Sequence, residues 1–253
     1  MSVADDMAEY GLTVLGVQET HMTEKEVETI RTTDGKKAFT VHHSSSNSEK
    51  KAGCAIITTE GLKCTFRAVS GRMCIMTITL KTDRNINIPI YIISCYAPTE
   101  PSCGKDPLLR ESFYNNLTSL EKTVCKRGTL IFTGDFNAKT GSGYGLAENR
   151  KGKLSNNGKA LLEFACQQQL VLTNTLFQHK LAHVTTRESP YREVNGADST
   201  TRKSLYRKHI DYIGIRNHSK ELVSNSRSHN GLNTFTDHRM VRMTMTLTAQ
   251  LWN

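Results

Sequence analysis

Acidic and polar side chains stand at the ends of strand-like segments in this sequence, where groups able to do chemistry can gather. The stretch 130–141, LIFTGDFNAKTG, runs from an apolar strand into Asp135 and Asn137, which flank Phe136. The period of two along a strand predicts Asp135 and Asn137 on one side of the chain and Phe136 on the other. The pair could cap a turn, or it could hold a metal ion, a water molecule or a phosphate.

Other strand ends carry groups of the same kind. Glu19 and Tyr96 close two apolar segments, Asp211 opens another, and Asp237 with His238 opens the last. In antiparallel neighbours the end of one strand lies beside the start of the next, so we expect these side chains to gather along one edge of the sheets. Crowded carboxylates repel unless a cation, protons or hydrogen bonds compensate, and an all-oxygen set suits Mg²⁺ or Mn²⁺. A His beside an Asp and a hard cation can promote attack of water on phosphorus.

Each residue also has a structural interpretation. A single acidic residue at a strand end is more often a turn or cap residue. His238 alone is more often a surface or structural imidazole, and Tyr96 could be only an aromatic ring at the edge of the core. The functional interpretation therefore rests on the coincidence of all the strand ends.

The segments that position these groups have the patterns of strands and helices. Short β-branched and apolar runs predict strands at 12–18, 53–59, 73–80, 88–96, 130–134, 210–215 and 240–248. Apolar residues at helical spacing predict helices at 3–10, 109–124 and 158–169, the last capped by Asn156-Asn157. The polar segments 42–51 and 187–209 are predicted to be mobile loops. The pattern favours one α/β domain with a mixed, largely antiparallel sheet core.

The composition favours a globular chain with a polyanionic partner. The chain of 253 residues has 33 Lys and Arg against 24 Asp and Glu, a net charge of +9. Basic clusters at 149–153 and 201–209 are usually just solvated, and charge alone does not choose between DNA, RNA and an anionic surface. No apolar run approaches the roughly 18 residues of a membrane span, and we expect no membrane association. Seven scattered cysteines without close pairs predict reduced thiols in an intracellular protein and disfavour a zinc site.

Five short motifs occur in the order found in a known superfamily. They are Gln18-Glu19-Thr20, Tyr96-Ala97-Pro98-Thr99, Gly134-Asp135-Phe136-Asn137-Ala138, Ile210-Asp211-Tyr212-Ile213 and Thr236-Asp237-His238-Arg239. This series resembles the endonuclease/exonuclease/phosphatase superfamily, which has the DNase I-like fold. The connecting residues 157–177 look most like the apurinic-type endonuclease domain of non-LTR (LINE-type) retrotransposons and the craniofacial-development-protein-2-like sequences that share this text.

The resemblance implies a four-layer α/β sandwich of two mixed, mainly antiparallel sheets flanked by helices, with residues 1–253 as a single domain. It also implies cleavage of phosphodiesters with Mg²⁺ (or Mn²⁺). Carried over position by position, Glu19 would bind the metal and Asp237 would support the same side. Asp135 would orient or deprotonate the attacking water.

The remaining residues of the motifs would act on the phosphate. By the resemblance Asn137 would hold a phosphate oxygen and Tyr96 would hydrogen-bond the phosphate. His238 would contact the scissile phosphate, with Asp211 orienting its ring. The basic cluster at 201–209 favours nucleic acid over small phosphate esters, and the resemblance implies DNA as the partner. The residues we expect to bind it are Arg202, Lys203, Arg207 and Lys208.

Three departures from the family pattern stand out. The family opens with a strand that carries an active-site Asn, and the sequence reaches its first helix without it. Thr99 stands where an amide is often found, and Thr185-Thr186 replaces a Thr-Trp on the expected DNA-facing side. We therefore expect an N-terminally truncated or decaying copy with impaired activity.

The sequence leaves three functions open. The first is a DNA-nicking endonuclease, monomeric, nuclear and joined to a reverse transcriptase in a longer element. The second is a phosphoesterase of the same fold acting on RNA or small phosphate esters. The third is a catalytically inactive remnant that binds nucleic acid.

Overall fold

The computed structural model of the chain describes residues 2–22, 27–45, 52–81, 87–124, 128–141, 153–195, 201–232 and 236–247. Between Ser189 and Tyr206 it describes the pairing of the strands and not the side chains. The helices α1 to α4 span Val3–Glu9, Glu100–Lys105, Leu108–Lys122 and Asn156–Gln167. Three 3₁₀ helices, η1 to η3, span Thr173–Thr175, Leu181–His183 and Asn217–Leu222.

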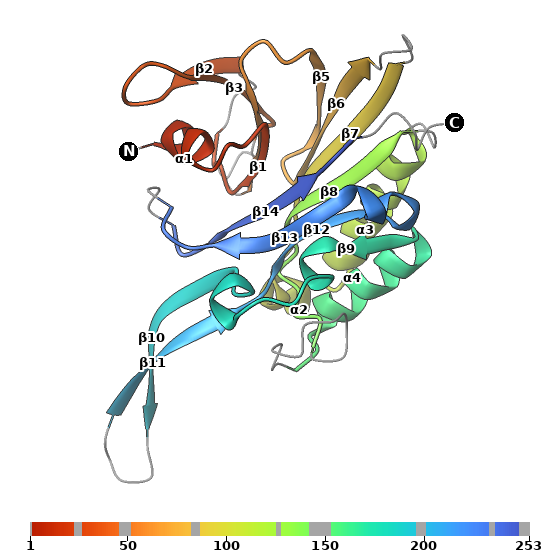
Figure 1. Ribbon diagram of the computed structural model, residues 1–253. Helices are drawn as coiled ribbons and strands as arrows, with labels where there is room; N and C mark the ends of the chain where they lie inside the picture. The colour runs from red at the N-terminus through yellow and green to blue at the C-terminus, as the bar shows by residue number, and fades with distance from the viewer. Residues whose placement is uncertain are drawn as a thin grey trace.

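A six-stranded sheet forms the centre of the molecule (Figure 1). Its strands, in the order β5-β6-β7-β8-β12-β9, are Cys64–Ser70, Met73–Lys81, Asn87–Tyr96, Thr129–Asp135, Asp211–Arg216 and Leu170–Leu172. The strands β7 and β8 run parallel, whereas the other neighbours run antiparallel, so the sheet is mixed. The near-continuous apolar runs of β7 and β8 fit their central position, because both faces of these strands are covered.

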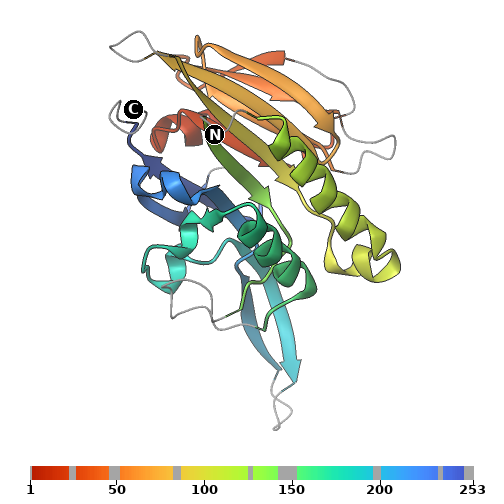
Figure 2. The same ribbon diagram turned by 90° about the vertical axis from the view of Figure 1, so that its right-hand side faces the viewer.

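The other strands form a second sheet and two antiparallel pairs. The four-stranded sheet has the order β1-β4-β3-β2, with strands Val14–Gln18, Cys54–Thr59, Ala38–His43 and Val27–Arg31. The pair β13-β14 joins Val223–His229 to Met240–Met245, and the pair β10-β11 joins Arg187–Asn195 to Thr201–Lys208. Figures 1 and 2 show β10 and β11 projecting from the body of the molecule.

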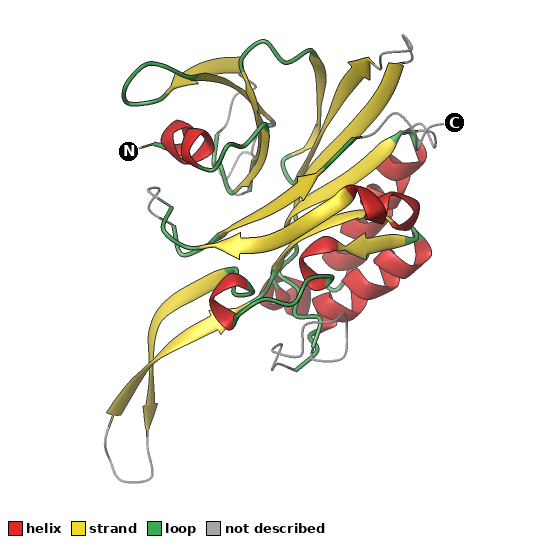
Figure 3. Cartoon of the chain, in the orientation of Figure 1, coloured by secondary structure: helices red, strands yellow, loops and turns green. Residues whose placement is uncertain are grey.

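Three apolar clusters bind the layers together. Met7 of α1 packs against Val41 and its neighbours on the outer face of the four-stranded sheet. Ile56 and Met76 belong to the cluster between the two sheets. Leu117 and its neighbours on α3 and α4 cover the outer face of the six-stranded sheet, where both helices lie in Figures 2 and 3. The order helix, sheet, sheet, helices confirms the predicted four-layer α/β sandwich.

The predicted strands and helices are confirmed, with two corrections. Ser155 caps α4 by accepting a hydrogen bond from the Gly158 N–H, whereas Asn156 and Asn157 are the first residues of the helix. The segment 187–209, predicted as a mobile loop, contains the paired strands β10 and β11. Its polar side chains lack the apolar alternation that marks a half-buried strand, which is why the pattern gave no strand signal. The segment 42–51 begins as the end of β3, and residues 46–51 lie outside the described ranges.

Two further predictions concern the compartment of the protein. The six cysteines within the described ranges carry free thiols, as predicted, and Cys125 lies outside those ranges. Across the same ranges, every helix is too short or too polar to cross a membrane.

An apolar groove of about 350 Å³ separates β1 from β14. Its walls are these two strands, and its floor includes Ile90, Ile92 and Ile131 of the six-stranded sheet. Within the described chain β1 pairs only with β4 and β14 only with β13, so each has one edge without a strand partner. In the described part of the chain, two strand edges without a neighbouring strand therefore border an apolar floor.

Candidate active site

Three predicted site residues lie side by side at the end of the six-stranded sheet. The parallel register places Tyr96 opposite Asp135, and the antiparallel register places Asp211 opposite the same Asp135. Residues in register across neighbouring strands point to the same face of a sheet. The sheet therefore brings together Tyr96 and Asp211, which are 115 positions apart in the sequence, on either side of Asp135.

His238 completes this row from the segment before β14. Its Nδ1 lies 3.0 Å from Oδ1 and 3.2 Å from Oδ2 of Asp211. Its Nε2 lies 3.9 Å from Oδ2 of Asp135. The hydrogen bond to Asp211 fixes the ring and leaves Nε2 facing Asp135.

Asp135 is the most enclosed acid of this row, with 5% of its surface exposed. Burial raises its pKa, and the charge of Asp211 raises it further, while the nearby His238 lowers it. The ligand atoms of Asp135, Asp211 and His238 all lie within 4.8 Å of one another. The site is thus a compact acid–imidazole cluster in which added positive charge would be favourable.

The pKa of His238 predicts a pH dependence of stability. Burial alone would lower this pKa, but the hydrogen bond and charge of Asp211, with the charges of Asp135 and Asp237, raise it to about 9. This pKa lies above that of an imidazole in the unfolded chain, about 6.5. The contribution of His238 to the free energy of unfolding is therefore complete below pH 6.5 and is lost as the pH rises through 9. Urea unfolding in EDTA should therefore show a free energy of unfolding that falls over this window. The free energy of unfolding of His238→Gln should fall less over the same pH range. An equal fall in both proteins would contradict the stabilising role of the His238 imidazolium.

Asp237, predicted to support the metal, is paired with a residue that the sequence did not indicate. Arg187 Nε donates to Asp237 Oδ2 at 2.8 Å, and Arg187 forms an antiparallel bridge with His238. The Glu188 N–H donates to the Asp237 carbonyl, and the Arg239 N–H donates to the Thr186 carbonyl. Thr186 and the first two residues of β10 thus hold the Asp237-His238 segment against the site.

Thr185 and Thr186, which stand where the family often has Thr-Trp, are both buried. The Thr186 hydroxyl accepts hydrogen bonds from the N–H groups of Ile210 and Asp211. A buried hydroxyl at this position anchors the start of β12, and with it the carboxylate that orients His238.

Glu19 reaches the site from the end of β1 with a φ of 56°, in the left-handed region that is uncommon for residues other than glycine. Burial raises the pKa of Tyr96, and a hydrogen bond to the Glu19 side chain raises it further, so Tyr96 is a phenol hydrogen-bond donor at neutral pH. Arg72 lies with its guanidinium carbon 5.0 Å from the centre of the Tyr96 ring and donates to the Tyr96 carbonyl.

The LIFTGDFNAKTG stretch turns sharply after Asp135. Gly134 is required there, since a Cβ would lie 1.8 Å from the Cys95 carbonyl oxygen on β7. The Asn137 N–H donates to Asp135 Oδ1 at 2.7 Å, and Nδ2 of Asn137 donates to the Ala97 carbonyl at 3.0 Å. Phe136 is buried with 1% exposed and anchors the turn from behind. Asp135 and Asn137 are held close to each other by the turn after β8, in which Asn137 has a positive φ of 47°, and not by the alternation of a strand.

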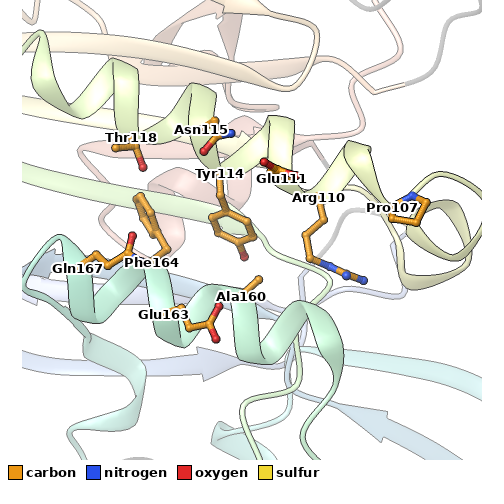
Figure 4. A pocket seen from close by; sticks show the side chains of 10 residues that line it. All are labelled: Pro107, Arg110, Glu111, Tyr114, Asn115, Thr118, Ala160, Glu163, Phe164 and Gln167. Atoms are coloured by element: carbon orange, nitrogen blue, oxygen red, sulfur yellow. The ribbon is translucent and has the colours of Figure 1, made fainter.

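Asn157 ties this turn to the loop after Tyr96. Its Nδ2 donates to the carbonyls of Pro98 and Asn137, at 2.8 and 3.2 Å. Arg110 Nε donates to Asn157 Oδ1 at 2.7 Å. Figure 4 shows Arg110 reaching from α3 toward α4, along the groove between these helices. The Asn157 amide is buried and is held in place by Arg110. Because it hydrogen-bonds to both loops, it sets the distance between them.

Replacing Asn157 with Ala should loosen both loops. The change leaves the Pro98 and Asn137 carbonyls and Arg110 Nε without their partner, and we expect a cost of about 2–3 kcal/mol in the free energy of unfolding. Hydrogen exchange should speed up at the amide of Asn137 in particular. Asn115→Ala, an exposed Asn on α3, is the matched control. Equal stability and exchange in the two variants would show that the network holds nothing in place.

The basic residues predicted to bind nucleic acid lie on β11. For Arg202 and Lys203 the structure describes the strand position, while their side chains lie outside the described part. Arg207 is exposed and pairs with Glu188, its Nε 2.8 Å from Oε1. Lys208 is partly buried and pairs in register with Arg187. The predicted basic residues thus lie on one strand of a hairpin, and one of them, Arg207, is paired with Glu188.

Comparisons with known proteins agree with this geometry. The chain is 30% identical to craniofacial development protein 2 of Bos taurus over 185 residues, which cover 67% of the chain and 28% of that protein. It is 28% identical to the protein of the same name from Tragulus javanicus, with the same 28% covered. The chain therefore spans a little over a quarter of the length of these curated relatives.

Solved structures share the fold at lower identity. The endonuclease domain of TRAS1, a telomere-specific non-LTR retrotransposon, matches with a TM-score of 0.62 and 16% identity, over 96% of this chain and 90% of that domain. The catalytic domain of Xenopus laevis APE2 matches with a TM-score of 0.61 and 14% identity, over 97% and 87%. The AP endonuclease LMAP from Leishmania major matches with a TM-score of 0.65 and 12% identity, over 97% and 81%.

The family model of the endonuclease/exonuclease/phosphatase family matches residues 2–238, a range that contains every site residue named above. With the four-layer sandwich and the acid–imidazole row at its sheet ends, this match establishes that the chain belongs to the endonuclease/exonuclease/phosphatase family.

Proposed function

We propose that this chain is a Mg²⁺-dependent endonuclease that nicks DNA and derives from a non-LTR retrotransposon. The observation that supports this most is the Asp211–His238–Asp135 row, a fixed imidazole with its free nitrogen facing a buried carboxylate. This arrangement suits general acid–base chemistry on a phosphodiester. The likeness of the fold to the TRAS1 endonuclease domain supports the retrotransposon origin.

The chain's own residues have distinct tasks in this proposal. Asp135 accepts a proton from the attacking water, which forms a bond to phosphorus as the P–O3′ bond breaks. The departing O3′ takes up a proton from solvent and becomes the 3′-hydroxyl. The protonated His238 ring faces the phosphate oxygens and stabilises the negative charge that develops on them. Asp211 keeps that ring oriented through Nδ1. The Tyr96 hydroxyl and the amide of Asn137 complete the phosphate contacts.

The acidic residues suit a hard divalent cation. The charges of Asp211 and Glu19 help to raise the pKa of buried Asp135, so a cation would relieve repulsion in this cluster. His238 Nδ1 is already bonded to Asp211, which favours the Asp135–Asp211–His238 group for proton handling and leaves Glu19 and Asp237 to hold the metal. When bound, Mg²⁺ or Mn²⁺ would supply positive charge to the phosphate oxygens.

A nucleic acid is the proposed substrate because the chain carries a net charge of +9 and a basic strand, β11, with Arg202, Lys203, Arg207 and Lys208. The resemblance to apurinic-type endonucleases favours DNA. The proposal extends to a monomer that acts in the nucleus, with a reverse transcriptase on the same polypeptide. The greater length of the curated relatives is compatible with further domains.

A strand seated between β1 and β14 would complete the enzyme. The family resemblance implies such a strand with an active-site Asn, and the groove between two unpaired strand edges supports the idea. The same open groove favours a second candidate, a catalytically inactive remnant that binds nucleic acid.

Supercoiled plasmid tests the proposed function directly. We expect the chain to convert it to nicked circles with Mg²⁺ and to leave it intact in EDTA. Parallel reactions with single-stranded RNA and with a nitrophenyl phosphate ester separate the phosphoesterase alternative. Salt-sensitive binding of DNA without cleavage of any substrate would favour the remnant and contradict the enzyme.

A further inference from the structure

The guanidinium of Arg187 lies among the acidic groups of the site. Its Nε is 2.8 Å from Asp237 Oδ2, and about a third of its side chain is exposed. Arg187 is the first residue of β10, and its backbone bridges to His238. An arginine is therefore fixed next to the two site residues that open the last motif.

The geometry shows how close this cation is to the centre. Asp237, which accepts the hydrogen bond from Arg187, has its Oδ1 3.9 Å from His238 Nε2. The same Nε2 lies 3.9 Å from Asp135 Oδ2, so the guanidinium lies next to the acid–imidazole row. A cation in such a place lowers the cost of bringing a negatively charged phosphodiester to these carboxylates.

The hydrogen-bonding capacity of Arg187 is only partly used. In the part of the chain that the structure describes, its side chain makes one hydrogen bond, from Nε. The neighbouring Arg207 and Arg239 are both paired with Glu188. Arg187 therefore retains the N–H groups of Nη1 and Nη2, which form the fork that matches two oxygens of a phosphate.

We infer that Arg187 binds a phosphate of the nucleic-acid backbone at the active site, with Asp237 holding Nε so that Nη1 and Nη2 are presented to the substrate. The inference rests on the proposed function and adds to it a residue that determines substrate affinity. In this role Asp237 positions Arg187 as well as supporting the metal side. An arginine that only neutralised the carboxylates would instead weaken metal binding and leave substrate affinity unchanged.

The test measures binding of a 20-base-pair DNA duplex in EDTA, where no cleavage occurs, over a series of salt concentrations. Arg187→Gln keeps the stem and one hydrogen-bond donor for Asp237, so we expect it to fold and to bind about tenfold more weakly. The slope of the logarithm of its binding constant against the logarithm of the salt concentration should become shallower by about one unit, as expected for one lost phosphate contact. Arg187→Lys should recover part of the affinity, because it keeps the charge without the fork.

Arg31→Gln is the matched control, since Arg31 lies on β2 of the four-stranded sheet and makes an exposed ion pair with Glu60, the residue after β4. It should bind the duplex as the unaltered chain does, apart from a small long-range charge effect. Mn²⁺ titration of each variant by electron paramagnetic resonance is the second readout. Unchanged DNA affinity with tighter Mn²⁺ binding in Arg187→Gln would overturn the inference while leaving the endonuclease proposal intact. Arg187-dependent binding in a chain that never nicks would support the inference and contradict that proposal.

Discussion

Replacing Asp135 with Asn is expected to lower the nicking rate by about 10²–10⁴-fold while raising the stability of the metal-free protein. The amide has the shape of the carboxylate but cannot take a proton from water. Asp135 is buried beside Asp211, and these two carboxylates repel each other, so removing one charge relieves the repulsion. A loss of activity together with a gain in stability is the behaviour of a functional residue and not of a structural one.

The measurement combines single-turnover nicking of plasmid with urea unfolding in EDTA. Asp34→Asn, the same chemical change at an exposed turn distant from the site, should leave the rate unchanged. DNA affinity should be equal or greater in Asp135→Asn, since a negative charge has been removed near the phosphate. Nicking at near the normal rate would rule out Asp135 as the group that activates water.

Replacing His238 should have an effect of similar size, and Asp211 should act through it. We expect His238→Gln to lose about 10²–10⁴-fold in rate, because the glutamine cannot carry the positive charge that faces the phosphate. Asp211→Asn should lose less, since the ring can still be protonated but its orientation and raised pKa depend on the carboxylate.

A double variant separates this arrangement from two independent contributions. If Asp211 acts only through the ring, adding Asp211→Asn to His238→Gln should cost little more than His238→Gln alone. The pH profile of the rate should shift to lower pH in Asp211→Asn, because the pKa of His238 falls without its partner. If the fold loss in nicking rate of the double variant equals the product of the two single losses, Asp211 has a role that is separate from His238.

The positions of the site residues could be predicted from the sequence because they follow from strand ends. Apolar runs that stop at Tyr96 and Asp135, and one that starts at Asp211, fix the row once the strands pair in register. Phe136 was equally predictable as a buried anchor, because an aromatic residue between two polar ones must face the core.

The contacts between distant segments were not predictable in this way. Arg187 stands in a polar stretch without periodicity, and only the bridge to His238 brings it to the site. Arg72 precedes a strand and gives no sign in the sequence that it lies against the Tyr96 ring. Asn157 read as a helix cap, although its side chain bonds two loops from other parts of the chain. Such side chains are assigned by tertiary packing, which local patterns do not encode.

The central claim is that the Asp135–His238 site makes water attack phosphorus, and isotope labelling tests it most directly. Plasmid is nicked in H₂¹⁸O with Mg²⁺, and the new DNA ends are analysed by mass spectrometry. The account predicts one ¹⁸O atom in a 5′-phosphate and an unlabelled 3′-hydroxyl, with no product in EDTA or from Asp135→Asn. Nicks that carry no ¹⁸O, or labelled nicks made at the normal rate by Asp135→Asn, would contradict it.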